Sequence, residues 1–172
     1  MSIYVLDSNF FIQAHRDSYP IDLALTFWQK VNDLAYAGTI VSIDKVKNEL
    51  YTHPSDPEKQ DLLEKWCHSN LPADFFKDTT LHIPSYQRVV EWANSKSGHY
   101  SPTALNEFLA VDEADAFLIA YALSDHTNCT IVTLEKSDPL NKKRIKIPEP
   151  CKHFNVRYIN SMTLFRELGE TF

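Results

Sequence analysis

Glycine is scarce in this chain of 172 residues, which contains only Gly38, Gly98 and Gly169. The phosphate-binding loops of Rossmann and P-loop proteins need several closely spaced glycines, because their backbone passes close to the phosphates. Both classes of nucleotide-binding protein are therefore excluded. The length is that of one ordinary domain, which buries roughly 70% of its unfolded surface and needs no disulfide or metal to hold its core.

Cysteine is also rare, and Cys67, Cys129 and Cys151 lie far apart in the sequence. Structural zinc sites and redox pairs typically use a short C-x-x-C spacing, which this chain does not have. We therefore expect three buried, reduced thiols. A metal ion bound by this chain would then have a catalytic role and not a structural one.

Long apolar runs are missing, since none approaches the roughly 20 residues of a membrane span. The start of the chain, Met-Ser-Ile-Tyr-Val-Leu-Asp, has no basic segment of the kind that begins a secretion signal. These features predict a cytoplasmic protein with no membrane partner. The net charge of -6 argues against a broad electrostatic surface for nucleic acid. It is compatible with an enzyme whose acids hold metal ions.

Short apolar segments alternate with helical patterns along the chain. Strands are predicted at 3–6, 39–43, 129–134 and 156–159. Helices are predicted at 8–14, 23–37, from 44 through 50, 61–69, 86–95, 102–109, 112–123, 149–154 and after 161. Strands that alternate with helices favour a parallel sheet covered on both faces. We therefore predict a single α/β domain that spans residues 1–172.

Acidic residues occur where such a sheet would bring them to one edge. They follow a predicted strand or begin the helix after one, and they are Asp7, Glu49, Asp112, Asp115 and Glu135. In open parallel sheets the carboxyl ends of the strands form the edge where reactive groups gather. Four separate segments of the chain thus offer a carboxylate to the same edge.

Each acid also has an explanation that involves no ligand. Asp7 can cap the helix that follows it. Asp112 and Asp115 resemble a capping pair, favoured by the positive end of the helix dipole. Glu49 can be an exposed helical residue, and Glu113 is expected to face solvent. These explanations apply to single residues and do not account for the shared edge.

Two residues compete to supply the carboxylate of the fourth segment. Glu135 is nearer the end of the strand, whereas Asp138 precedes a proline, as turn residues do. Crowded carboxylates repel one another unless a cation compensates them. Oxygen ligands without clustered histidine or cysteine favour Mg²⁺ or Mn²⁺. Such ions polarise a phosphoryl oxygen and activate water for attack on a phosphodiester. The pattern therefore predicts metal-assisted nuclease chemistry.

Four segments carry a family resemblance over most of the chain. They are Tyr-Val-Leu-Asp7-Ser8-Asn9, Val46-Lys-Asn-Glu49-Leu, Ala114-Asp115-Ala-Phe-Leu-Ile-Ala-Tyr-Ala and Ile131-Val-Thr133-Leu-Glu135. In order and setting they resemble the PIN-domain family, whose bacterial members include the VapC-type ribonuclease toxins. The first and third segments are the specific ones.

The resemblance implies an α/β/α sandwich that hydrolyses RNA with divalent metal ions. It implies that the principal metal ligands are Asp7, Glu49 and Asp115, with a turn shaped by Ser8 and Asn9 and a fourth-acid loop steadied by Thr133. It also implies an antitoxin that blocks the site and a frequent homodimer. One departure is that the family often has an aspartate directly after Val-Thr, where this chain has Leu134 and then Glu135.

The chain is longer than a compact toxin of this family, mainly through a segment at about 53–101 that is predicted to be a helical insertion. A basic run follows the fourth-acid loop and consists of Lys142, Lys143, Arg144 and Lys146. This run predicts contacts with RNA phosphates beside the metals, although a solvated charged run has the same composition.

Three other functions compete with a metal-dependent endoribonuclease that acts as the toxin of a toxin-antitoxin pair. A haloacid-dehalogenase-like phosphatase also places an Asp after its first strand, but it needs a second Asp two residues later, where this chain has Asn9. A catalytically silent PIN-fold module would bind RNA or an antitoxin without cutting. A DNA-directed nuclease of related fold would use the same acids.

Overall fold

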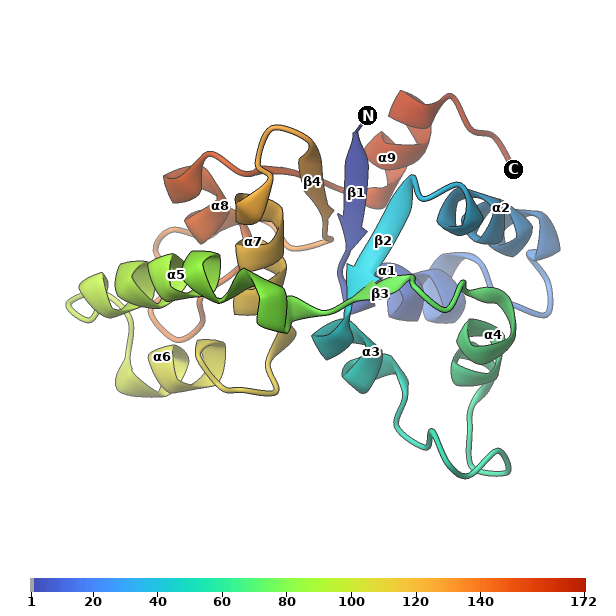
Figure 1. Cartoon of the computed structure of the whole chain (residues 1–172), viewed down its shortest axis with the longest axis horizontal. Coiled ribbons are helices and arrows are strands. Elements are labelled where there is room, and N and C mark those ends of the chain that lie inside the picture. The colour runs from blue at the N-terminus through green and yellow to red at the C-terminus, as the bar shows by residue number, and fades with distance from the viewer. Residues whose placement is uncertain (1) are drawn as a thin grey trace.

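A parallel β-sheet forms the centre of the protein, whose computed structural model describes residues 2–172 (Figure 1). Met1, the first residue of the predicted domain, lies outside the described residues. The strands are β1 (Ile3–Leu6), β2 (Ile40–Ile43), β3 (Phe76–Lys77), β4 (Cys129–Val132) and β5 (Arg157–Ile159). Their order is β3-β2-β1-β4-β5, and every pairing is parallel. The predicted α/β class is therefore confirmed.

The central strands are apolar on both faces, as strands are in a sheet covered by helices on both sides. Val5 of β1 is fully buried and pairs with Val41 of β2 and Ile131 of β4. This register places the carboxyl ends of β1, β2 and β4 side by side. The residues that follow these three strands therefore meet at one edge of the sheet.

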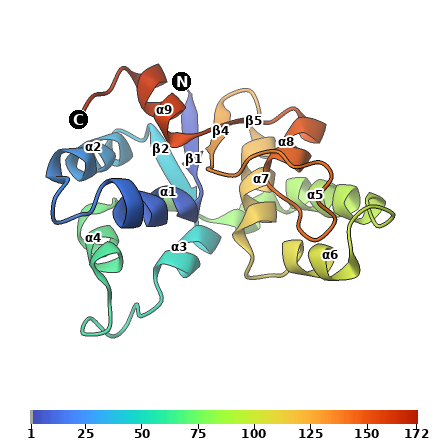
Figure 2. The same cartoon turned by 180° about the vertical axis from the view of Figure 1, so that it is seen from behind.

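Helices cover both faces of the sheet. They are α1 (Ser8–Gln13), α2 (Leu25–Tyr36), α3 (Asp44–Leu50), α4 (Leu62–Asn70), α5 (Ile83–Ser95), α6 (Pro102–Phe108), α7 (Ala114–Ser124), α8 (Pro148–Phe154) and α9 (Ser161–Leu168). Figures 1 and 2 show α1, α2, α4 and α9 on one side and α5 to α8 on the other, with α3 at the end of β2. The strand order explains this division, because the chain adds β2 and β3 on one side of β1 and then returns to add β4 and β5 on the other side. The result is the predicted three-layer α/β/α sandwich.

The segment at 53–101 contains more than the helices expected of it. It holds α4, β3, a 3₁₀ turn (Thr79–His82) and all of α5. The two-residue strand β3 pairs with Ser42 and Ile43 at the edge of the sheet. Two residues are too few to show alternation, so the sequence pattern does not reveal this strand. The description of the chain as one domain with an insertion stays a prediction.

The helix that carries Asp115 begins later than its pattern predicts. α7 starts at Ala114, Glu113 occupies its N-cap position without a side-chain bond, and Asp112 is exposed in the preceding turn. The predicted capping pair of Asp112 and Asp115 is therefore wrong. The helix buries residues on nearly all sides, because α5 packs over it with the ring of Tyr86 stacked on Phe117 at 4.3 Å.

The three cysteines are free and buried, which confirms the expectation of unpaired, buried thiols. Burial raises the pKa of Cys129 to about 11, so its thiol is protonated at neutral pH. Within residues 2–172, no helix has the length and apolar character needed to cross a membrane.

Candidate active site

Asp7 directly follows β1 and is only 2% exposed. It occupies the N-cap position of α1, but its side chain makes no capping bond. Instead, the Thr133 hydroxyl donates to its Oδ2 at 3.1 Å, and the side chains of Ser8 and Asn9 lie at 3.4 Å from its carboxylate. The simple explanation of Asp7 as a helix cap is therefore wrong.

Thr133 connects the first acid to the loop of the fourth. It follows β4, the neighbour of β1, and is 2% exposed. Its hydroxyl oxygen donates to Asp7 and accepts a hydrogen bond from the backbone N–H of Glu135 at 3.2 Å. This geometry agrees with the role that the resemblance implies for Thr133.

Asp115 lies in the first turn of α7 and is 9% exposed. Burial raises the pKa of its carboxyl well above the usual value, and the charges of Asp7, Glu135 and Glu113 raise it further. The guanidinium of Arg144, whose Nη2 lies 3.9 Å from Oδ2, acts in the opposite direction. Asp115 is thus surrounded by like charges with one cation nearby.

Glu49 joins this group from α3, where it lies in the last turn and not near the start as its pattern predicts. Burial raises its pKa, the Ser8 hydroxyl lowers it, and the charges of Asp7 and Glu113 raise it. The backbone N–H of Ala114, at the start of α7, also stabilises the charged form. Glu49 therefore lies between the first acid and the helix of Asp115.

Glu135, and not Asp138, faces the other acids. Its charge raises the pKa of both Asp7 and Asp115. Its own carboxylate accepts from Arg144 Nη2 at 2.8 Å and from the Ile147 backbone N–H at 2.7 Å. Asp138 instead accepts from Asn141 and lies 3.7 Å from the Lys146 ammonium. The structure thus gives Asp138 the turn role that its proline neighbour indicates.

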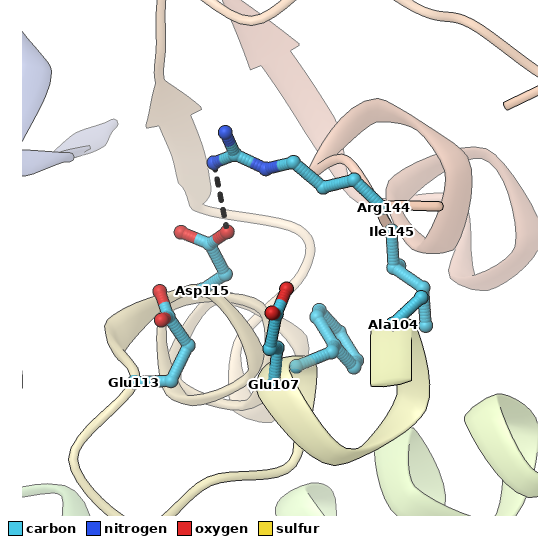
Figure 3. Close-up of a pocket in the computed structure, with 7 residues that line it drawn as sticks. Ala104, Glu107, Glu113, Asp115, Arg144 and Ile145 are labelled. Atoms are coloured by element: carbon cyan, nitrogen blue, oxygen red, sulfur yellow. Dashed lines mark ion pairs between the residues drawn. The ribbon is translucent and has the colours of Figure 1, made fainter. Parts of the chain in front are cut away.

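Glu113 replaces Asp112 in the cluster, so the expectation that Glu113 faces solvent is wrong. It is half-buried, and its charge acts on both Glu49 and Asp115. Figure 3 shows the carboxylates of Glu113, Asp115 and Glu107 on the side of Arg144, where they line a cavity of about 290 Å³. Glu107 follows no predicted strand, so the sequence pattern does not single it out, whereas Glu113 lies beside Asp112 in the predicted first turn of this helix.

The basic run after Glu135 divides into two parts. Arg144 pairs with Glu135 and Asp115, and Lys146 pairs with Asp138. Lys142 and Lys143 are exposed, and neither belongs to an ion pair within residues 2–172. Half of the predicted phosphate-binding run therefore compensates acids of the protein itself.

The donor set at this edge consists of carboxylate oxygens. Within the described residues, no three His, Cys, Asp or Glu side chains already converge on a point suitable for a metal ion. Asp7, Glu49, Asp115 and Glu135 nonetheless lie close enough to alter one another's pKa. Arg144 is the cation that compensates two of them, because its Nη2 lies 2.8 Å from Glu135 and 3.9 Å from Asp115. Oxygen ligands of this kind fit Mg²⁺ or Mn²⁺.

The chain was compared with curated proteins and with models of protein families. No curated protein matches the chain. One family matches residues 4–172, a range that contains every acid of the cluster, under the description "Domain of unknown function (DUF4411)". Since the match covers nearly the whole chain, the protein belongs to this family.

Proposed function

We propose that the protein is a divalent-metal-dependent endoribonuclease of the PIN type and the toxin of a toxin-antitoxin pair. The observation that supports this most strongly is the convergence of Asp7, Glu49, Asp115 and Glu135 from four segments on one edge of a parallel sheet. The pKa values of the first three are raised by burial and mutual repulsion. Perturbed acids grouped in this way are typical of functional sites.

Mg²⁺ or Mn²⁺ would be held by Asp7, Asp115 and Glu135 together with Glu49. Such ions, when bound, polarise a phosphoryl oxygen and activate water for phosphodiester hydrolysis. Asp112 is left out of this set because it is exposed outside the cluster. Glu113 is the additional carboxylate whose charge acts on both Glu49 and Asp115.

The residues around the acids orient them. Thr133 fixes the carboxylate of Asp7, and the Ile147 N–H fixes that of Glu135. Arg144 offsets the negative charge of Asp115 and Glu135, a task that a divalent cation would take over. The guanidinium, once released, suits an RNA phosphate because it donates in a planar, bidentate manner. Lys142 and Lys143 are exposed on the same loop and would add phosphate contacts.

Cleavage of a labelled mixed-sequence RNA and a matching single-stranded DNA, with Mg²⁺ or Mn²⁺ and with a chelator, tests the proposal. Cleavage of RNA that requires the metal supports it. Cleavage of DNA but not of RNA would mean that the substrate is DNA. Hydrolysis of a small aryl phosphate would favour a phosphatase. The phosphatase lacks support at present, because the Asn9 amide contacts Asp7 where a second acid is needed.

A catalytically silent PIN-fold module is a second candidate, favoured by one observation. Arg144 already neutralises two of the acids that a metal would need. Such a module would bind RNA or a protein partner through the same edge without cutting. RNA binding without cleavage, in wild type and in Arg144→Ala alike, would favour this candidate over the nuclease.

Three further parts of the proposal rest on the PIN resemblance. We propose a cytoplasmic location, a cognate antitoxin that covers the acidic edge, and assembly as a homodimer. Co-purification with the product of an adjacent gene, and the mass of the purified protein in solution, test the two assembly claims.

A further inference from the structure

A groove adjoins the acidic edge on the side of β4 and β5. Its volume is about 590 Å³, and its walls are the loop at 133–137, the end of β5 and the first turn of α9. We call it the α9 groove. Two residues of the acidic edge, Thr133 and Glu135, also line it. The groove is therefore continuous with the candidate active site.

The apolar and basic side chains of the α9 groove are open to solvent. Lys136 is exposed, and Met162 keeps 46% of its surface accessible. Leu134 and Tyr158 are half-buried. A molecule in the groove can therefore contact each of these side chains without any change in the fold.

Polar groups in the first turn of α9 are also available. The hydroxyls of Ser161 and Thr163, both half-buried residues, make no hydrogen bond within residues 2–172. Asn160 caps the helix, because its side-chain oxygen accepts from the Thr163 N–H at 2.9 Å. The cap thus leaves both hydroxyls free to donate to a ligand.

The uncompensated charge of the α9 groove is positive. The carboxylate of Glu135 accepts from Arg144 Nη2 at 2.8 Å and from the Ile147 N–H at 2.7 Å. Lys136 belongs to no ion pair among the described residues. A chain with a net charge of -6 thus places an unpaired cation directly beside its acidic cluster. This arrangement favours an anionic ligand that extends beyond the acids.

The surface changes beyond Met162. A smaller hollow of about 240 Å³ shares Leu134, Ser161 and Met162 with the groove. In the part of the chain that the structure describes, no lysine or arginine lines this hollow, and its wall includes the exposed acid Asp17. Favourable contacts with an anion are therefore confined to the α9 groove, between Glu135 and Met162.

We propose that the α9 groove holds the RNA strand on one side of the phosphodiester that the acidic edge cleaves, an inference that rests on the proposed function. Lys136 and the hydroxyls of Ser161 and Thr163 bind the neighbouring phosphate, because lysine and small hydroxyl side chains are common donors to nucleic-acid phosphates. The attached base rests on Tyr158 and Met162, as unstacked bases do on aromatic and apolar side chains.

Met162→Glu tests this inference, because it should affect folding and binding differently. Met162 lies in the first turn of α9, where a carboxylate interacts favourably with the helix dipole, so the variant should melt no lower than wild type. The same charge repels phosphate. Binding of a fluorescein-labelled single-stranded RNA, followed by anisotropy in EDTA, should weaken at least about tenfold.

Leu62→Glu is the matched control. Leu62 is 54% exposed, lies in the first turn of α4 and does not line the α9 groove. The charge change and the helical position are thus comparable with those of Met162→Glu. This variant should bind RNA within about twofold of wild type, as substitutions away from a binding surface do.

Two further changes test the phosphate contacts without adding a charge. Lys136→Ala should weaken binding and lower the slope of log affinity against log salt by about 0.7, the value for one phosphate contact on a single strand. Lys65→Ala, which removes an exposed lysine from α4, should leave the slope unchanged. Ser161→Ala combined with Thr163→Val keeps the helix cap and should weaken binding about threefold. The thermal midpoint in EDTA establishes that each variant is folded.

The outcomes separate this inference from the nuclease proposal, because binding is measured without metal. The expected pattern of binding in a protein that never cleaves RNA would support the groove and contradict the nuclease. Metal-dependent cleavage, together with equal binding by wild type, Met162→Glu and Lys136→Ala, would overturn the groove and leave the nuclease in place. No saturable binding by wild type would also overturn the groove. So would a Met162→Glu variant that changes the mass of the protein in solution but not its affinity for RNA, because a second copy of the chain then covers this surface.

Discussion

Asp115 is buried beside three other acids and one arginine, so its negative charge is unfavourable in the metal-free protein. Burial contributes most to its raised pKa, followed by the charges of Asp7, Glu135 and Glu113. Arg144 compensates only in part, because its Nη2 lies 3.9 Å from Asp115 and its side chain is 57% exposed. Removing Asp115 and removing Arg144 should therefore have opposite effects on the melting temperature of the metal-free protein.

Asp115→Asn should raise the melting temperature of the metal-free protein by roughly 2–4 °C, which corresponds to about 1 kcal/mol in a chain of this size. The physical reason is the loss of repulsion from neighbouring carboxylates. The same change should weaken Mn²⁺ binding. Differential scanning fluorimetry in EDTA and calorimetric titration with Mn²⁺ measure the two effects. A variant that melts at a lower temperature would indicate that Asp115 stabilises α7 through its dipole instead.

Arg144→Gln should lower the melting temperature in EDTA, because Glu135 and Asp115 lose their cation. The expected loss is about 1 kcal/mol, since the exposed guanidinium is partly screened by solvent. Added Mn²⁺ should stabilise this variant more than wild type. Lys143→Gln is the matched control, because Lys143 is an exposed neighbour that contacts no acid within the described chain. Equal effects of the two changes would contradict the assigned role of Arg144.

At the element scale, helix caps distinguish acids that stabilise the fold from acids that form the site. The Asp61 side chain accepts from the Glu64 N–H at 2.8 Å and caps α4. Asp112 makes no such bond, because α7 begins two residues later at Ala114. The same residue type therefore has different consequences at the two positions.

Asp61→Ala should cost about 1 kcal/mol of stability, the usual value for a lost N-cap. Asp112→Ala should change stability by less than about 0.5 kcal/mol, as exposed substitutions do. Urea denaturation of both variants, read by circular dichroism, makes the comparison. A loss at Asp112 as large as that at Asp61 would restore the capping pair that the sequence pattern suggests.

The elements that could be predicted are those with a strong local pattern. The strand predicted at 3–6 and the helix predicted at 23–37 are examples, and the chain leaves that helix through Gly38, whose φ is 70°. What could not be predicted depends on tertiary contacts. The strand β3 exists only because it pairs with β2, and Glu113 belongs to the cluster only because α7 starts at Ala114.

The position of the candidate site could be predicted in outline, because two of its acids directly follow predicted strands. Asp7 and Glu135 follow strands that neighbour one another in the sheet, so topology alone brings them together. The pairing of Arg144 with Glu135 could not be predicted, because it depends on the path of the loop between β4 and α8. Spacing in the sequence says nothing of this path.

At the scale of the whole molecule, the acidic cluster makes stability depend on pH. The folded pKa values of Asp7, Glu49 and Asp115 are raised, so these groups hold protons that the unfolded chain loses from a pH of about 4 upward. The unfolding free energy must therefore fall as the pH rises through the raised values. Their contribution to stability is fully present only below the unfolded pKa.

The metal-free protein should accordingly melt at a lower temperature at pH 8 than at pH 5, by an amount on the order of 1 kcal/mol. Asp115→Asn should flatten this dependence, and saturating Mg²⁺ should flatten it too because a cation stabilises the charged acids. Melting curves at several pH values between these limits provide the measurement. Stability that rises across this range in wild type would contradict the picture of mutually repelling, buried acids.

The most direct test of the central claim is the single-turnover rate of RNA cleavage with Mn²⁺ by wild type, Asp7→Asn and Asp138→Asn. Asp7 belongs to the buried cluster, whereas Asp138 lies in the loop after Glu135 and pairs with Lys146. We predict a loss of at least about 100-fold for Asp7→Asn and a change within about twofold for Asp138→Asn. If Asp7→Asn cleaves RNA at the same rate as wild type, the acidic edge is not the catalytic centre.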